Sequence, residues 1–206
     1  MPGPSLTTDA VILGVQPPSD SFQGLTAFSP AHGLLRIFRR TTGKTSAAGA
    51  IPDLFDELTL TLEGAPQGDA WFLKETRLLA RHAGIARRYK ALVRASALAT
   101  IIARNPGPED SRADIHALLR TAFGAFATSA HPDVVYLKSL YRLARDEGYP
   151  LSQQWLPSLP PALRATASAL LRTPLGALTD VQANDTTALV GRLEAFLRDY
   201  TDIQLS

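Results

Sequence analysis

The chain has 206 residues, of which 45% are hydrophobic and 19% charged, and its formal net charge is +2. That length suffices for one large domain or two small ones, and the composition is typical of a soluble globular protein. The absence of cysteine excludes disulfides, thiolate zinc sites and cysteine nucleophiles, and no apolar run is long enough for a membrane span. The first five residues lack the basic start and apolar core of a secretory signal, so a cytoplasmic protein is expected.

The N-terminal part of the chain, residues 1–80, has the pattern of a small β domain. Leu58, Leu60 and Leu62 alternate with polar residues, which is the period-two pattern of a half-buried strand. Gly33 follows a turn-forming segment and is able to adopt a positive φ there. Strands are predicted at residues 10–15, 25–28, 34–40, 58–62 and from 71 onward. Five short strands with one long connection predict a partly open barrel of the OB-fold type, with a fragment of a β-sandwich as the alternative.

Residues 81–206 have the periodicity of an all-helical domain, so the fold class is predicted to be α+β, with the domain boundary near residue 80. Helices are predicted at residues 85–104, 111–126, 132–147, 163–171 and 186–200. The apolar face of the first helix is expected to contain Ile85, Tyr89, Leu92, Val93 and Ser96. The proline-rich segment 151–161, which includes Trp155, is expected to be a connector.

Motifs of catalysis and cofactor binding are missing from the sequence. Gly43-Lys44-Thr45 resembles the end of a phosphate-binding loop, but that motif requires glycine where the chain has Phe38. None of the four histidines has a second ligand at the spacing of a metal-binding helix, and there is no nucleophile elbow or dinucleotide-binding turn. We therefore expect a protein that is not an enzyme and that uses neither a metal nor a cofactor.

The strongest local signal of function lies in the predicted third strand. Arg36, Phe38 and Arg40 project to one face because side chains alternate along a strand, and Arg39 and Lys44 lie close by. An exposed aromatic ring between cations suits single-stranded nucleic acid, since the ring stacks on a base while guanidinium groups hold phosphates. The following segment, 41–49, is small and polar and could close over the strand. The alternative is that Phe38 belongs to the core and that the arginines only confer solubility.

A second basic feature lies in the first predicted helix. No Asp or Glu occurs from residue 76 to 108, where seven Arg or Lys residues are found. Arg87, Lys90 and Arg94 have the spacing of one helical stripe opposite the apolar face, and Arg88 flanks it. Such a stripe could extend a phosphate track, although phosphate contacts alone read no sequence. A solvated helix face is the alternative interpretation.

The order of these features resembles the RecO family of recombinational DNA-repair proteins. In that family an OB-fold is followed by a helical domain, and the resemblance extends over most of the chain. The segments that resemble the family are 10–13, 25–36, 39–46, 58–60, the strand through Thr76, 136–143 with Gly148-Tyr149-Pro150, and 193–200. Many relatives carry a four-cysteine zinc module after the Gly-Tyr segment, whereas residues 151–161 stand there without cysteine, so no zinc is expected.

The resemblance implies a recombination mediator. Such proteins bind single- and double-stranded DNA, anneal complementary strands, and act with RecR and single-stranded-DNA-binding protein to load RecA at gaps and breaks. The resemblance therefore implies a cytoplasmic, nucleoid-associated protein whose helical domain contacts other proteins and adds DNA contacts. The basic loop is poorer than in relatives, with threonine at positions 41 and 42. The alternative function is that of a protein-interaction scaffold on a RecO-like frame without significant DNA binding.

Overall fold

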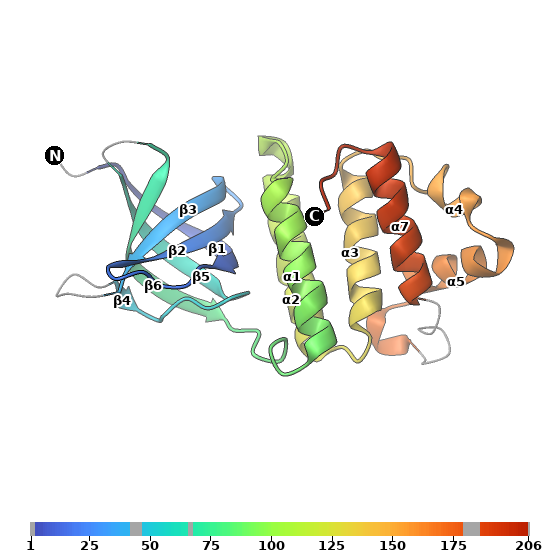
Figure 1. Cartoon of the computed structure of the whole chain (residues 1–206), viewed down its shortest axis with the longest axis horizontal. Helices are drawn as coiled ribbons and strands as arrows, with labels where there is room; N and C mark the ends of the chain where they lie inside the picture. Colours follow the sequence, from blue (N-terminus) through green and yellow to red (C-terminus); the bar gives the residue numbers. More distant parts are fainter. Residues whose placement is uncertain (1–2, 42–46, 66–67, 179–185, 206) are drawn as a thin grey trace. The chain divides into compact units, whose positions relative to one another are not determined.

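The N-terminal strands form a closed ring. The computed structural model describes residues 3–41, 47–65, 68–178 and 186–205. Its strands are β1 (Ser5–Val15), β2 (Phe22–Ser29), β3 (Gly33–Arg40), β4 (Ala48–Gly49), β5 (Glu57–Gly64) and β6 (Ala70–Ala80). They form one mixed sheet in the order β3-β2-β1-β5-β6-β4 (Figure 1). Parallel pairing of β3 with β6 closes five of these strands into a ring, which confirms the predicted five-stranded barrel of an α+β protein.

The barrel closes because its strands are long and one of them bends. β1 pairs with β5 along its first half and with β2 along its second half, and its register shifts between Ile12 and Gly14. Such an irregularity bends a strand and increases its twist, which allows one strand to serve two neighbours. Gly33, the first residue of β3, follows a turn and has a φ of 66°, the positive value that its position predicts.

The interior of the barrel is filled by the alternating apolar residues of its strands. Leu58, Leu60 and Leu62 are completely buried, as the period-two pattern predicts. The core consists of Ala10, Ile12, Leu25, Ala27, Leu35, Ile37, Leu58, Leu60, Leu62 and Leu73. One feature of this region was not predicted: the end of the segment expected to be a loop, Ala48–Gly49, forms the short strand β4 and pairs with β6.

The remaining elements are helical. They are α1 (Tyr89–Arg104), α2 (Arg112–Thr128), α3 (Pro132–Asp146), α4 (Trp155–Ser158), α5 (Pro161–Arg172) and α7 (Thr186–Tyr200), with 3-10 turns at Glu109–Ser111 and Leu175–Ala177. In Figure 1, α3 lies between α1 and α7, and it packs on both. The segment 151–161 is not wholly a connector, because α4 forms within it.

The chain divides into two compact units. The barrel unit comprises Met1–His82 with Pro106–Arg120, and the helical unit comprises Ala83–Asn105 with Thr121–Ser206. Residue 82 therefore ends the first stretch of the barrel unit, close to the predicted boundary near residue 80. The barrel unit also takes in the first half of α2, which follows α1 in the sequence.

The predicted apolar face of α1 is wrong at two of its five residues, while Ile85, which precedes the helix, is buried and Leu92 and Ser96 are half-buried. Tyr89 is 82% exposed and Val93 is 43% exposed. The buried residues are instead Ala91, Ala95, Leu98, Ala99, Ile101 and Ile102. The buried face of α1 therefore combines three alanines with three larger apolar side chains, and α1 packs on α3.

Candidate nucleic-acid interface

The outer face of β3 carries the cation–aromatic–cation series predicted from the sequence. Leu35 and Ile37 point into the barrel and are buried, whereas Arg36, Phe38 and Arg40 are exposed on the opposite side. Phe38 is 38% exposed, so it is not a core residue. The strand thus presents a ring to solvent with a guanidinium group two residues away on each side.

Phe38 belongs to a cluster of three rings that the sequence did not suggest. The ring centroids of Phe22 and Phe72 are 5.9 Å apart, those of Phe38 and Phe72 are 6.4 Å apart, and those of Phe22 and Phe38 are 6.5 Å apart. The guanidinium carbon of Arg40 lies 5.3 Å from the centre of the Phe22 ring. We call Phe22, Phe38 and Phe72 the aromatic cluster.

Strand register explains how the cluster forms. Phe22 pairs with Arg40 across the antiparallel β2–β3 ladder, and Phe38 pairs with Phe72 across the parallel β3–β6 ladder. Residues paired in this way share a face of the sheet. The β2 residue opposite Phe38 is Gly24, which has no side chain to cover the ring. The cluster therefore depends on the closure of the barrel.

Two of the residues predicted near this face differ from the others. Arg39 projects to the same side of β3 as Ile37, is half-buried, and donates a hydrogen bond from Nη2 to Oε1 of Gln23 over 3.0 Å. Its side chain is therefore held by a neighbour on β2 and does not lie on the face of the aromatic cluster. Lys44 lies outside the described residues.

The predicted basic stripe on α1 is not a continuous solvent-exposed feature. Arg87 precedes the helix, and it and Lys90 are exposed. Arg88 donates hydrogen bonds to the backbone carbonyls of Phe126 and Ser129 at the end of α2. These contacts place Arg88 in the packing of the helical unit and leave Arg87 and Lys90 accessible to a ligand.

Arg94, the last residue of the predicted stripe, also has partners within the helical unit. Its Nε donates to Oδ1 of Asp133 over 2.6 Å, and its guanidinium group lies 4.9 Å from the centre of the Tyr136 ring. The Tyr136 hydroxyl in turn donates to Glu194, and burial, together with this carboxylate, raises the pKa of Tyr136. Arg94 therefore joins α1 to α3.

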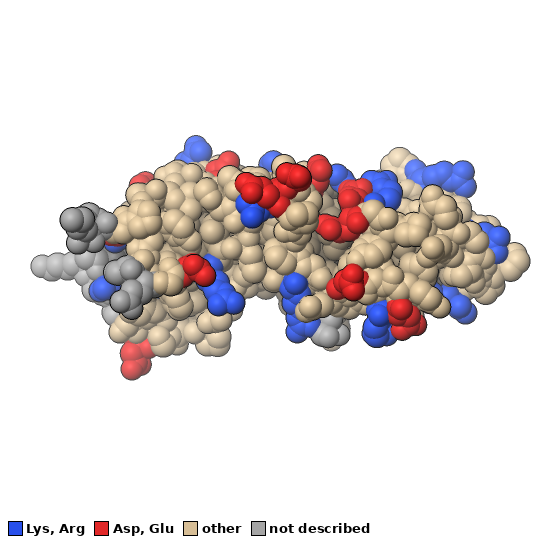
Figure 2. Space-filling model, turned by 90° about the horizontal axis from the view of Figure 1, so that it is seen from above, with Lys and Arg blue, Asp and Glu red and all other residues tan. Residues whose placement is uncertain are grey.

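On the face that Figure 2 presents, Lys and Arg side chains occur singly or in small groups among Asp and Glu, without one continuous basic surface. On this face, electrostatic attraction would therefore act locally, at particular arginines and lysines, rather than over a broad basic surface.

A buried ionic network lies elsewhere in the barrel unit. The Glu57 carboxylate accepts a hydrogen bond of 2.7 Å from Nε of Arg120 and lies 3.0 Å from Nε2 of His82. Burial alone would raise the pKa of Glu57, but these hydrogen bonds and charges outweigh it, so its pKa lies below the ordinary value. Burial lowers the pKa of nearby His116, and the Arg120 charge adds to this effect. The network connects β5, the segment that follows β6 and the first half of α2.

The neighbouring carboxylate is held in the same way. Asp56 is buried and accepts two hydrogen bonds from Arg81, of 2.9 and 2.7 Å, while its Oδ2 also accepts from the backbone N–H of Asp53. Every charged group in this network has a partner of opposite charge, which is the condition for stable burial. We therefore assign the network a structural role in the barrel unit and not a catalytic one.

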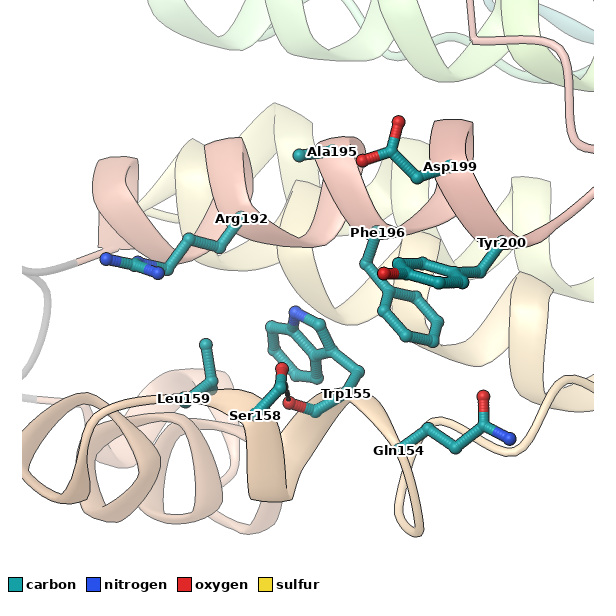
Figure 3. A pocket seen from close by; sticks show the side chains of 9 residues that line it. All are labelled: Gln154, Trp155, Ser158, Leu159, Arg192, Ala195, Phe196, Asp199 and Tyr200. Carbon is teal, nitrogen blue, oxygen red and sulfur yellow. Dashed lines mark hydrogen bonds between the residues drawn. The ribbon is translucent and has the colours of Figure 1, made fainter.

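The helical unit has a groove between α4 and α7, with a volume of about 370 Å³. Figure 3 shows the indole of Trp155 rising from α4 toward α7, where the rings of Phe196 and Tyr200 lie together. The centroids of these two rings are 5.0 Å apart. Among the described residues, the buried Nε1 of Trp155 has no hydrogen-bond partner. Arg192 supplies a cation at the edge of the groove.

No group of three or more His, Cys, Asp or Glu residues that could hold a metal ion occurs in the described part of the chain. Within those same residues, none of the helices has the length and apolar character that crossing a membrane requires. No protein-family model matches the sequence, and no curated protein matches it at a significant level.

Proposed function

We propose that this protein is a non-catalytic DNA repair and recombination mediator of the RecO type. It would bind single- and double-stranded DNA, anneal complementary strands, and help to load RecA together with RecR and single-stranded-DNA-binding protein. The support is the order of the two parts, a five-stranded barrel and then helices, which is the order that the resemblance implies. Its location would be cytoplasmic and nucleoid-associated.

The observation that carries the proposal is the outer face of β3. Arg36 and Arg40 are exposed on the same face of the barrel as the aromatic cluster. Guanidinium groups bind phosphates, and ring faces offer a stacking surface for bases. Electrostatic capture of the backbone releases counterions, so DNA binding at this face must weaken as salt rises. Arg87 and Lys90, which are exposed, would add phosphate contacts from the helical unit.

The second candidate function is a protein-interaction scaffold without significant DNA binding. The groove between α4 and α7 favours it, because aromatic side chains line a concave surface there. Aromatic residues and arginine are enriched at protein interfaces. In the mediator proposal the helical unit would carry the surfaces for RecR and single-stranded-DNA-binding protein, so a groove of this kind is compatible with both functions.

Fluorescence anisotropy of a labelled single-stranded oligonucleotide across a salt series tests the proposal. We expect the wild-type affinity to fall steeply with salt. Arg36→Ala/Arg40→Ala removes two phosphate contacts, which reduces the slope of log K against log salt by about 1.4, since each contact to a single strand contributes roughly 0.7. The control is Arg172→Ala/Arg198→Ala, which removes the same charge from exposed sites in the helical unit.

Two results separate the candidate functions. A flattened slope in the β3 variant with an unchanged slope in the control supports DNA binding at the barrel. If the wild type binds no oligonucleotide even at low salt, the mediator proposal fails and the scaffold function is the better description.

A further inference from the structure

The aromatic cluster and the two arginines of β3 differ in what they can recognise. Arg36 and Arg40 lie two residues from Phe38 on either side, about 6.6 Å along the strand at a rise of roughly 3.3 Å per residue. A guanidinium group binds the phosphates of a single strand or of a duplex, because every phosphate of either backbone carries a negative charge. A phenyl face gains its energy only from a base whose own face is free.

In a duplex each base is covered above and below by its neighbours, so its face cannot reach a protein surface unless the stack opens. Unpaired nucleotides have no such constraint, and aromatic side chains bind them with little regard to sequence. We infer that Phe38 and Phe72 make this face selective for unpaired nucleotides, while Arg36 and Arg40 bind paired and unpaired strands alike. The inference rests on the proposed function and names the discriminating residues of that same site.

The geometry singles out Phe38 and Phe72 within the cluster. Arg40 lies over the Phe22 ring and so competes with any base for that ring. Phe38 is the most exposed of the three and has only Gly24 opposite it on β2. Phe72 is half-buried beside it on β6, tilted by 42° with its centroid 6.4 Å away. Phe38 therefore supplies the accessible face, and Phe72 extends it across the β3–β6 pair.

The charges around the cluster support nucleic acid as its occupant over an apolar protein partner. An apolar protein surface docking on the cluster would have to desolvate Arg36 and Arg40, which flank the ring. A polynucleotide supplies a phosphate for each guanidinium group and a base for the ring from one chain. This complementarity favours unpaired nucleic acid as the occupant of the cluster.

The test compares the affinities of a 20-nucleotide single strand and the 20-base-pair duplex of the same sequence for each variant. Phe38→Leu/Phe72→Leu keeps apolar bulk on the outer face and removes both rings. We expect its affinity for the single strand to fall about tenfold or more, at the lower end of measured stacking contributions. Its affinity for the duplex should stay within about twofold of wild type, and its salt slope should not change, because no phosphate contact is lost.

Matched variants separate the inference from the proposed function. Phe38→Tyr/Phe72→Tyr keeps the ring faces and should retain the preference for the single strand, and Tyr200→Leu removes an exposed ring from the helical unit and should leave it unchanged. Arg36→Ala/Arg40→Ala should weaken both ligands together. If the wild type binds both ligands and the leucine variant loses both equally or neither, the inference is wrong while DNA binding stands. If the wild type binds neither, the proposed function fails and the inference with it.

Discussion

The pair between Glu57 and Arg120 gives a sharp test of how the barrel unit is held together. The Glu57 side chain is only 7% exposed, whereas Arg120 is 58% exposed. Replacing Arg120 with methionine keeps the apolar stem of the side chain and removes its charge and hydrogen bond. The buried carboxylate then keeps its contact with Nε2 of His82.

The expected loss of stability follows from this asymmetry. Breaking a fully buried ion pair by removing one partner costs roughly 3–5 kcal/mol, and a hydrogen bond to a charged group contributes about 1.5–3 kcal/mol. Because Arg120 is more than half exposed, water can replace part of its contact with Glu57, so we expect the lower range, about 2 kcal/mol at pH 7. For a chain of this length that corresponds to a decrease in melting temperature of about 4–8 °C.

The pH dependence provides an independent check with a defined sign. The folded-state pKa of Glu57 lies below its ordinary value of 4.5, so this carboxylate stabilises the fold above that pH. That contribution is lost as the pH falls through the lower folded-state value. Removing Arg120 leaves the burial that raises the pKa of Glu57 and takes away the largest opposing influence. The difference in stability between wild type and variant should therefore narrow as the pH decreases from 7 toward 4.

Urea denaturation of both proteins at several pH values measures these differences. The control is Arg142→Met, which removes an i,i+4 ion pair with Asp146 at the surface and should cost no more than about 0.5 kcal/mol. An Arg120→Met variant as stable as this control would refute the assignment of Glu57 to a buried network. A difference that widens on acidification would refute the sign of the pKa argument.

Three further predictions concern single residues. Gly33→Ala should cost about 1–2 kcal/mol in a thermal melt, since φ is 66° and an added Cβ would lie 3.0 Å from Arg112. Lys138→Met should destabilise the helical unit by about 1 kcal/mol, seen as a lower urea midpoint, because the half-buried ammonium group donates to carbonyls at the end of α5. Arg94→Ala should lower the melting temperature, because it removes the hydrogen bond to Asp133. Lys90→Ala should leave the melting temperature unchanged and weaken DNA binding. Equal melting temperatures of the two variants would contradict a structural role for Arg94 and an accessible position for Lys90.

The barrel was predictable from sequence because strand periodicity is strict. Side chains alternate with period two, so Leu58, Leu60 and Leu62 had to share a face, as did Arg36 and Phe38. Whether a face points inward depends on which set is apolar. The three leucines decide this for β5, whereas for Phe38 the sequence left a core position open, and its 38% exposure excludes it. The short strand β4 could not be predicted, since its two residues acquire strand geometry only by pairing with β6.

The helices were harder to predict because burial there depends on the neighbour. Tyr89 and Val93 favoured one face of α1, but the buried face is the one that carries Ala91, Ala95 and Ala99 together with Leu98, Ile101 and Ile102. The repeat of alanine every four residues marks this buried face. A pattern of large hydrophobic residues does not reveal such a face, because alanine contributes little to an apolar pattern.

The basic stripe predicted on α1 is not a continuous exposed feature for a similar reason. Arg94 pairs with Asp133, 39 positions later in the sequence, and Arg88 reaches carbonyls 38 and 41 positions later. A helical spacing rule considers only neighbours within about two turns, so it could not separate these residues from Arg87 and Lys90. Charge patterns along one element thus identify cations that are able to bind a phosphate, and tertiary structure decides which of them are available.

The aromatic cluster also depends on tertiary structure, but here strand pairing brings the residues of a site together. Phe38 was identified because its cationic neighbours lie on its own strand, whereas Phe22 and Phe72 lie on β2 and β6. Only the two ladders of β3 bring them together, and one of those ladders, the parallel pairing with β6, exists because the ring closes. A site built from side chains of three strands has no signature in any single segment, yet its position follows once the strand order and one register are known. For a barrel of this type, a search for function should therefore begin with the residues paired to an exposed aromatic side chain.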